Sequence, residues 1–261
     1  MPKRSAASSC LLDDLRNVDI QISDKPYVLL FAEWLNVGEV AVKLAPKHEE
    51  YVSTERENIT YVTKFIVPFT PHMLPAIAVG KCKVSEWLRA VDEKNTLEEM
   101  WARISTKKDK TLQYVVEPRV HGASLWDIQL ENVAQAVDVA IQVAQALTIC
   151  EEKLFVHNDL HFHNIFFFEL DALDELEYKF PPELSNFSFP TKIKITIFDY
   201  DESFIARNQE DFRAYKNKDW TQFMTEWKAL AEQQLQEEIP VFSFDDNGPL
   251  GFIRRITQDI D

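Results

Sequence analysis

The chain has 261 residues, of which 46% are hydrophobic and 12% aromatic, enough to bury one two-lobed core or two small ones. A formal net charge of -15 at pH 7 argues against broad binding to nucleic-acid phosphates and against attraction to anionic membranes. No apolar run approaches the length of about 18 residues that a membrane span needs, and "MPKRSAASSC" lacks the apolar core of a secretory signal. We therefore expect an intracellular protein, cytoplasmic or nuclear, with no direct contact to nucleic acid or membrane.

The cysteines and the N-terminus support the same expectation. Cys10, Cys82 and Cys150 are odd in number, widely separated and outside any zinc-like CxxC spacing, so they are expected to be reduced thiols. Residues 1–17 are expected to form a disordered tail. Its basic "PKR" is either a nuclear signal or only solubilising.

The first third of the chain predicts strands followed by a helix. Residues 18–45 contain three β-rich runs divided by the turn-like "SDKP" and "NVGE", which suggests an antiparallel meander. Apolar residues then recur at helical spacing from Ile59 to Ile66, with Ser53 or Thr54 as the N-cap, before "PFTPHMLP" ends the helix.

The remaining elements follow in chain order. The pattern predicts a helix over 84–106, a strand over 111–118, one or two helices over 124–150 and a helical last third with aromatics on one face. The strand "TLQYVVEP" precedes the turn-like "PRVHG", so it marks a boundary between two lobes. "IFFFEL" and "KIKITIFDY" predict two further strands, and the polar connection at 171–191 is either a surface insertion or contains a short helix that the pattern does not reveal.

Two polar clusters flank these last strands. "HNDLHFHN" at 157–164 supplies Asp159 and Asn164, and "FDYDES" at 198–203 supplies Asp199. Their oxygens are the ligands of hard cations such as magnesium, and so suit phosphate chemistry. A cation for the phosphates is available at Lys43, which the strand pattern of "EVAVKL" points to the opposite face from its two neighbours.

In this order the motifs resemble those of the protein kinase-like superfamily. "VAVKL" is similar to the strand that carries the ATP-binding lysine, "HNDLHFHN" to the catalytic loop H-x-D-x-x-x-x-N, and "FDYD" to the metal-binding D-F-G segment. The likeness covers roughly residues 18–228. It implies an α+β, bilobal protein kinase-like fold, with a small β-rich N-lobe at 18–118 and a mainly helical C-lobe at 119–261 that carries an insertion near 171–191.

The resemblance also implies roles for individual residues. Asp159 would orient or deprotonate the acceptor hydroxyl, Asn164 and Asp199 would hold Mg²⁺, and Lys43 would contact the α- and β-phosphates of ATP. The two cofactors implied are therefore ATP and Mg²⁺. Asp219 in "NKDWTQF" resembles the buried aspartate that anchors the catalytic loop.

Further positions complete the implied site. Glu57 is expected to pair with the lysine because it leads the apolar face of "ENITYV", with Glu55 as the close competitor if the helix boundary differs by a residue. Val116 and Glu117, in the segment similar to the interlobe hinge, would offer backbone groups to adenine. His157 is expected to pack within the loop, and His161 and His163 are read as hydrogen-bonding residues near it.

The chain departs from the family pattern in two places. None of its five glycines lies between Val18 and Leu35, so "SDKP" replaces the glycine-rich phosphate loop. Tyr200 and Asp201 replace Phe-Gly, and the stretch from Asp199 to Asp219 is too short for an ordinary activation loop. Haspin-like and large-DNA-virus kinases also shorten this region, and the compact form points to a viral origin.

The implied activity is an ATP- and Mg-dependent phosphotransferase, a protein Ser/Thr kinase that needs no loop phosphorylation. Its acidic surface would favour a basic protein substrate. Two alternatives stay open. The absent glycine loop favours a pseudokinase that acts as a protein-binding module, and the "DLH" sequence would permit a small-molecule kinase.

Overall fold

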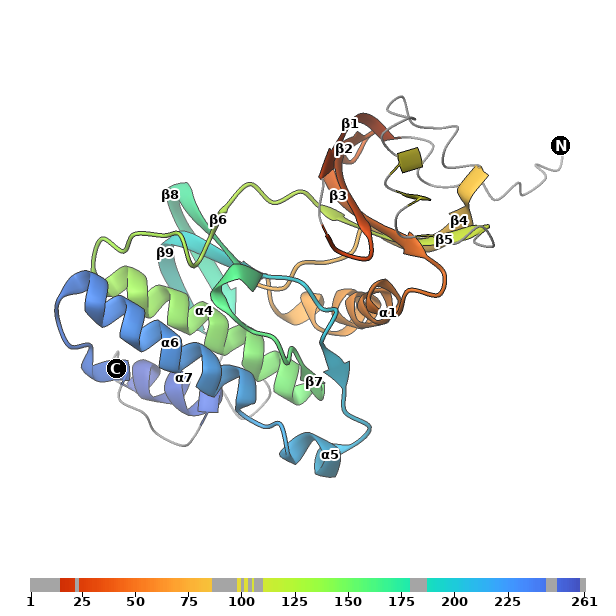
Figure 1. Ribbon diagram of the computed structural model, residues 1–261. Coiled ribbons are helices and arrows are strands. Elements are labelled where there is room, and N and C mark those ends of the chain that lie inside the picture. Colours follow the sequence, from red (N-terminus) through yellow and green to blue (C-terminus); the bar gives the residue numbers. More distant parts are fainter. Residues whose placement is uncertain are drawn as a thin grey trace, which may run out of the picture. The chain divides into compact units, whose positions relative to one another are not determined.

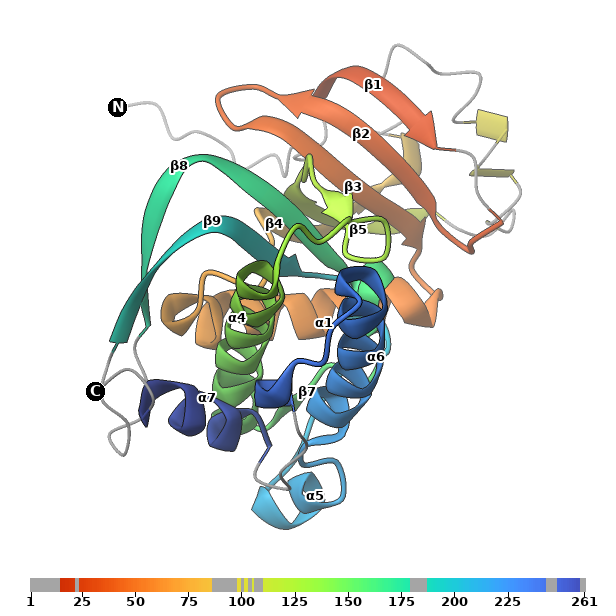
Figure 2. The same ribbon diagram turned by 90° about the vertical axis from the view of Figure 1, so that its left-hand side faces the viewer.

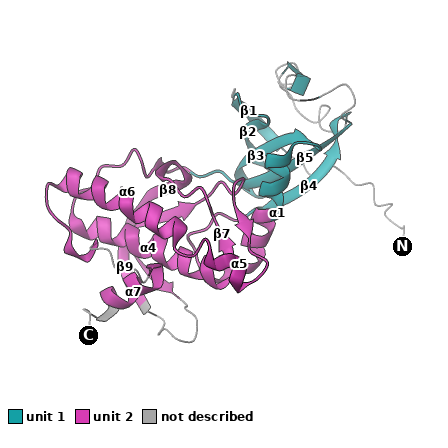
Figure 3. Ribbon diagram, turned by 60° about the horizontal axis from the view of Figure 1, so that its bottom comes forward, with its two compact units in different colours: residues 1–57, 76–120 teal, residues 58–75, 121–261 magenta. Residues whose placement is uncertain are grey.

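The computed structural model shows a mixed protein of antiparallel sheet and helices (Figure 1). It describes residues 15–21, 24–85, 98–99, 101–102, 105, 110–178, 187–242 and 248–258. The chain divides into two compact units, the first formed by 1–57 and 76–120 and the second by 58–75 and 121–261 (Figure 3). The sequence pattern places all of 18–118 in one lobe, whereas in the structure 58–75 belong with the second unit.

The first unit is built on a five-stranded antiparallel sheet in the order β1-β2-β3-β5-β4 (Figure 2). Its strands are β1 (Leu15–Gln21), β2 (Val28–Trp34), β3 (Gly38–Pro46), β4 (Ala78–Lys83) and β5 (Thr111–Pro118). The predicted meander and the strand at 111–118 are confirmed, and β4 was not predicted. Leu15 already lies in β1, so the expected tail ends earlier than residue 17; residues 1–14 lie outside the described part of the chain.

Alternation along β2 and β3 builds the core of this unit. Val28 and Leu30 of β2, and Val42 and Leu44 of β3, are fully buried, as expected for strands with one face on the core. Cys82 of β4 is also buried, and it is disulfide-bonded. The expectation of three reduced thiols is therefore wrong for Cys82, because spacing along the chain does not determine which thiols meet in space.

One helix follows the meander, as predicted. α1 (Glu50–Phe65) begins at Glu50, so the two N-cap candidates, Ser53 and Thr54, lie inside the helix and not at its start. Its apolar positions Ile59 and Val62 are fully buried. A short 3₁₀ turn, η2 (Val67–Phe69), follows it. The helix predicted at 84–106 falls largely outside the described residues, which are helical at 84–85, 98–99 and 101–102.

Three helices pack together in the second unit (Figure 1). They are α4 (Val133–Glu152), α6 (Lys218–Leu235) and α7 (Gly248–Gln258). The region predicted as one or two helices thus contains one, which starts where the Asn132 side chain accepts the Gln135 N–H. By length and hydropathy α4 could cross a membrane, but 72% of its most apolar window is buried inside the protein.

The second unit also contains a long hairpin of β8 (Ile165–Tyr178) and β9 (Phe187–Ile197) (Figure 2). The short strand β6 (Ala123–Ser124) pairs with β8. Pairing runs from Ile165 opposite Ile197 to Tyr178 opposite Phe187, with a bulge between Glu169 and Asp174. Most of the expected connection at 171–191 is therefore strand. Residues 170–175 are exposed or half-buried on both faces, so the apolar alternation that signals a strand is absent there.

Candidate functional site

The 157–164 loop is held at its start by a buried carboxylate. Asp219, in the first turn of α6, accepts the backbone N–H of His157 through Oδ2 at 2.8 Å and that of Asn158 through Oδ1 at 2.9 Å. Hydrogen bonds to an ionised acceptor are shorter and stronger than neutral ones. The anchoring role expected for Asp219 is therefore matched by its contacts.

Inside the loop, Asn164 fixes Asp159. The Asn164 amide nitrogen donates to the Asp159 carbonyl at 3.0 Å and to its carboxylate at 3.2 Å. Two acceptors on one side identify the amide nitrogen, so the amide oxygen is the atom left to bind a cation. The Asp159 side chain is 41% exposed, which suits a group that must meet a substrate.

His157 is packed beneath the loop. Its side chain is buried, and Nε2 donates to the Phe198 carbonyl at 2.9 Å while the ring meets Tyr200 edge-on. The Ser203 hydroxyl donates to the His157 carbonyl at 2.9 Å. The imidazole is enclosed, as expected for a packing role, but the bond of Nε2 is to Phe198 outside the loop and Nδ1 has no hydrogen-bond partner among the described residues.

Tyr200 anchors the second polar segment, 198–203. Its ring is fully buried, and its hydroxyl lies 2.8 Å from the Ile197 carbonyl and 3.2 Å from the Leu74 carbonyl. The Asn58 amide donates to the carbonyls of Tyr200 and Ser203 at 2.8 and 2.6 Å. A tyrosine therefore fits where the family pattern has phenylalanine, because its added hydroxyl has backbone acceptors.

Three polar residues around these segments adopt left-handed backbone conformations. Asn158, Asp199 and Asn217 have φ of 69°, 65° and 62°. Asparagine and aspartate tolerate this region better than other residues with a side chain. Asp199 itself is half-buried and lies two residues after the end of β9.

In the first unit, Lys43 forms an ion pair with Glu55. The ammonium lies 2.5 Å from Glu55 Oε1, and Glu55 is only 1% exposed. Glu57 is exposed, so the choice of Glu57 as the partner is wrong. Because α1 starts earlier than the N-cap candidates suggest, it is Glu55, four residues before buried Ile59, that shares the buried face.

Tyr27 also lies beside the lysine. The Lys43 ammonium is 5.7 Å from the centre of the Tyr27 ring, within the range of a cation–π contact. Tyr27 directly follows the turn-like "SDKP" and precedes β2. Only its position between this turn and a strand could have suggested the contact.

The backbone groups of Val116 and Glu117 serve the sheet. The Val116 carbonyl accepts the Ile77 N–H at 2.8 Å. Glu117 lies opposite Ala41 of β3. Two residues later, the Arg119 N–H donates to the Glu39 carbonyl of β3. Because every second residue of an antiparallel strand directs its backbone groups to the same neighbour, those of Glu117 are also directed to β3. The Val116 carbonyl and Glu117 thus take part in the sheet, and the expectation that these two residues offer backbone groups to adenine stays a prediction.

The Phe166 and Phe198 side chains form an aromatic pair that the sequence reasoning missed. Their ring centres are 4.1 Å apart, with an angle of 9° between the planes, and both side chains are half-buried. Phe166 lies two residues after Asn164, and Phe198 directly precedes Asp199. The pair could have been suggested only by knowing that Ile165 lies opposite Ile197 in the hairpin.

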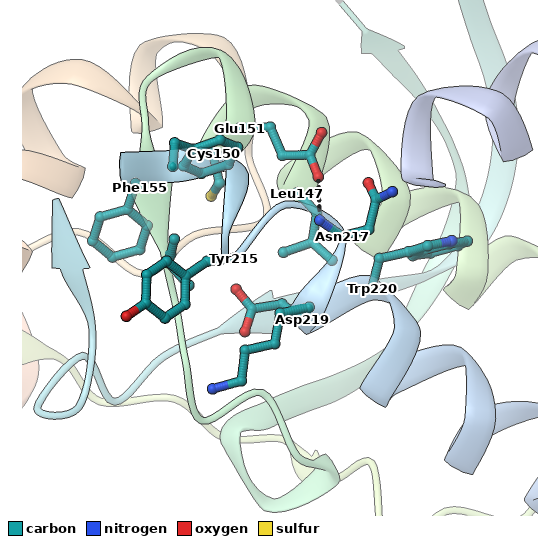
Figure 4. Close-up of a pocket in the computed structure, with 11 residues that line it drawn as sticks. Leu147, Cys150, Glu151, Phe155, Tyr215, Asn217, Asp219 and Trp220 are labelled. Atoms are coloured by element: carbon teal, nitrogen blue, oxygen red, sulfur yellow. Dashed lines mark hydrogen bonds between the residues drawn. The ribbon is translucent and has the colours of Figure 1, made fainter. Parts of the chain in front are cut away.

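A small cavity lies behind Asp219 (Figure 4). Glu151 lines it and accepts the Asn217 N–H at 3.2 Å; burial raises the pKa of Glu151, partly offset by this bond. Burial also raises the pKa of the free Cys150 thiol well above its usual value, with Asp219 and Glu151 adding to the effect. A thiol that stays protonated is a poor nucleophile, so the cavity is not a reactive-cysteine site.

A wider, open hollow of about 480 Å³ is lined by residues 121–123, 128–129 and 167–169. Gly122 lies at its edge, where an added Cβ would come 2.7 Å from the Phe167 carbonyl oxygen. The close approach of the chain to β8 therefore requires glycine.

Within the described ranges, no group of three His, Cys, Asp or Glu side chains has the arrangement of a metal site. Mg²⁺ needs fewer protein ligands, since one or two carboxylates and substrate phosphates commonly hold it. The Asn164 amide oxygen and the Asp199 carboxylate have the required chemistry.

Neither a scan against protein-family models nor a search of curated proteins finds a match to this chain.

Proposed function

We propose that the protein is an ATP- and Mg-dependent phosphotransferase of the protein kinase-like class, acting on Ser or Thr of a protein. The observation that carries this proposal is the doubly fixed Asp159 loop. Asp219 holds its first two backbone N–H groups, and Asn164 holds the carboxylate-bearing residue. Phosphoryl transfer depends on positioning and electrostatics more than on covalent chemistry by the protein, so a rigid, exposed carboxylate is the part that it requires.

The ion pair in the first unit supports the same class. A lysine on the third strand, paired with a glutamate on the next helix, is the arrangement that protein kinases use to hold the phosphates of ATP. Lys43 on β3 and Glu55 on α1 have this relation. The stacked Phe166 and Phe198 would add an apolar face for the adenine base.

Each remaining residue would have one task. Asp159 would accept the proton of, or orient, the acceptor hydroxyl. Asn164 and Asp199 would hold Mg²⁺, which supplies charge neutralisation on the phosphates when bound. Because the Asp219 clamp is part of the folded loop, no phosphorylation should be needed to form the site.

A pseudokinase remains the second candidate on one observation. Tyr27 and "SDKP" stand where a glycine-rich loop would cover the phosphates, and Tyr27 contacts Lys43. A small-molecule kinase is the third, since His161 Nε2 lies 3.3 Å from the Asp159 carboxylate in the "DLH" sequence.

The test is Mg-dependent ATP turnover and phosphorylation of basic proteins by the parent, Asp159→Asn and Asp199→Ala, with exposed Asp211→Asn on α5 (Gln209–Arg213) as the matched control. We expect turnover in the parent and control and its loss, by at least about 100-fold, in the two site variants at unchanged melting temperature. A melting shift with Mg-ATP but no turnover would establish the pseudokinase. No shift and no turnover would reject nucleotide binding altogether.

A further inference from the structure

An exposed aromatic surface borders the 157–164 loop within the second unit. Trp126 is 58% exposed, and its ring lies 5.4 Å from that of His163 and 6.3 Å from that of Phe162. Its backbone N–H donates to the Ser124 hydroxyl at 3.1 Å, which in turn donates to the Phe162 carbonyl at 3.2 Å. The Trp126 backbone is thus fixed to the loop, and the indole lies beside two of the loop's rings.

A chain of contacts connects Trp126 to Asp159. The His163 and His161 ring centres are 5.7 Å apart, and His161 Nε2 lies 3.3 Å from the Asp159 carboxylate. An extended peptide advances about 3.3 Å per residue. A polypeptide with its hydroxyl at Asp159 would therefore reach Trp126 with a side chain only a few residues away.

The stretch of sequence that carries Trp126 and the loop is strongly acidic, although Lys218 of α6 donates to Asn158 in the loop. Between Val120 and Tyr178 the sequence has eleven Asp and Glu residues and one Lys or Arg, Lys153. Lys153 pairs with Glu152 and lies over the Phe69 ring. The one basic residue of this stretch is therefore not directed at Trp126, and the acidic residues favour the binding of a cationic ligand.

We propose that Trp126 is a specificity residue that binds an arginine side chain of the protein acceptor, a few residues from the phosphorylated Ser or Thr. This inference rests on the proposed phosphotransferase function. Tryptophan is the best aromatic partner for a cation, and guanidinium groups are the cations most often found over it. A polypeptide is the occupant because Trp126 lies on an open surface, whereas small-molecule sites are concave.

The experiment uses nine-residue peptides with a central Ser, Ala elsewhere, and one Arg placed in turn at each other position, with Gln in place of Arg as reference. The parent, Trp126→Ala, Trp126→Phe and the matched control Leu173→Ala, which alters an apolar residue that is 63% exposed on β8, are compared. We expect Arg at one or more positions to raise kcat/KM about 2- to 30-fold over Gln in the parent and control. The ratio should fall to about one in Trp126→Ala and be partly kept in Trp126→Phe.

Binding of the same peptides, measured by calorimetry, separates this inference from the proposed function. A Trp126-dependent preference for Arg in binding, without phosphate transfer, would support the arginine site and reject the phosphotransferase. Transfer with no preference for Arg, or with a preference that Trp126→Ala leaves intact, would overturn the arginine site alone. The absence of both Arg-selective binding and transfer would overturn both.

Discussion

Lys43 and Glu55 bury two opposite charges against each other, so the loss of either charge removes the ion-pair partner of the other. The Lys43 side chain is 10% exposed, and Glu55 is almost fully enclosed. Removing one partner of a buried pair is much more costly than removing an exposed charge, because the remaining ion has lost its water as well as its partner. Stability, as well as activity, therefore depends on the identity of this glutamate.

Glu55→Gln is expected to lower the free energy of unfolding by about 3 kcal/mol. Glu57→Gln, an identical change on the exposed face of the same helix, should alter it by less than about 0.5 kcal/mol. Urea unfolding at pH 7 measures both. Equal effects of the two variants would show that the pair does not form in solution.

His72 makes stability depend on pH. It is fully buried in the second unit, with Nδ1 3.1 Å from the Ile195 carbonyl and Nε2 2.8 Å from the Tyr178 hydroxyl. Burial lowers the pKa of His72 to about 3; the Ile195 carbonyl opposes this and Lys194 adds to it. The unfolded histidine has a pKa of about 6.5. Between these two pKa values the histidine is protonated in the unfolded state and neutral in the folded state. Stability is therefore lost as the pH falls from about 6.5 toward about 3.

Between pH 7.0 and 4.5 this one group should remove about 2 to 3 kcal/mol of unfolding free energy. Urea unfolding of the parent and of His72→Gln at the two pH values isolates its share, because other acid-sensitive groups are common to both. The exposed His48→Gln should behave like the parent. A parent and a His72→Gln protein with the same loss on acidification would contradict the neutral, buried state of His72.

At the scale of the element, α4 binds the hairpin through a polar side chain in an apolar helix. Gln142 is fully buried; its amide donates to the Ile193 carbonyl at 3.1 Å and accepts the Ile195 N–H at 2.9 Å. These are backbone groups on the outer edge of β9, which pairs with β8 on its other side. An edge strand needs such partners when it is covered by the protein.

Gln142→Leu should therefore cost about 1 to 3 kcal/mol, since it removes the partner of the buried Ile195 N–H, whereas the Ile193 carbonyl keeps its bond from the Thr191 hydroxyl. The same change at exposed Gln233 on α6 is the control and should cost less than about 0.5 kcal/mol. Thermal and urea unfolding give both values. A Gln142→Leu protein as stable as the parent would mean that the β9 edge finds other partners.

The elements that could be predicted are those whose signal lies within their own residues. The meander at 18–45 alternates or is bounded by turns, and the buried stretch of α4 is continuously apolar, so both followed from local pattern. β4 and the outer half of the β8–β9 hairpin did not, because their residues are mostly exposed or half-buried and their pairing is fixed by partners distant in sequence.

Some residues of the candidate site could likewise be predicted from the sequence, and others could not. Asp159, Asn164 and Asp219 could be chosen because their spacing follows a known motif. The bond from Asn164 to Asp159 and the bonds from the loop backbone to Asp219 agree with that choice. Glu55 required the true start of α1, which no cap signal marked. Trp126 required the turn at Ser124, a feature of hydrogen bonds and not of composition.

At the scale of the whole molecule, the net charge of -15 creates a field that should attract basic substrates before contact. Salt shortens the range of this attraction, with a Debye length of about 10 Å at 0.1 M and about 3 Å at 1 M. Association with a cationic peptide should thus be salt-sensitive even where each contact is weak.

Raising NaCl from 0.05 to 0.5 M should lower kcat/KM for an Arg-containing peptide by at least about threefold relative to its Gln-containing counterpart. Initial rates at several salt concentrations, with ATP saturating, give the comparison. The Gln peptide controls for salt effects on nucleotide binding. Parallel salt dependence of the two peptides would show that the protein's field does not select the acceptor.

The scarcity of glycine lowers the conformational entropy of the unfolded chain. The whole sequence has five glycines, yet seven other residues in the described part adopt left-handed conformations, Asn158 and Asp199 among them. Glycine at these positions would cost less in the folded state but would leave the unfolded chain many more conformations to lose. The loops around Asp159 and Asp199 therefore lose less backbone conformational entropy on folding than the same loops would with glycine at these positions.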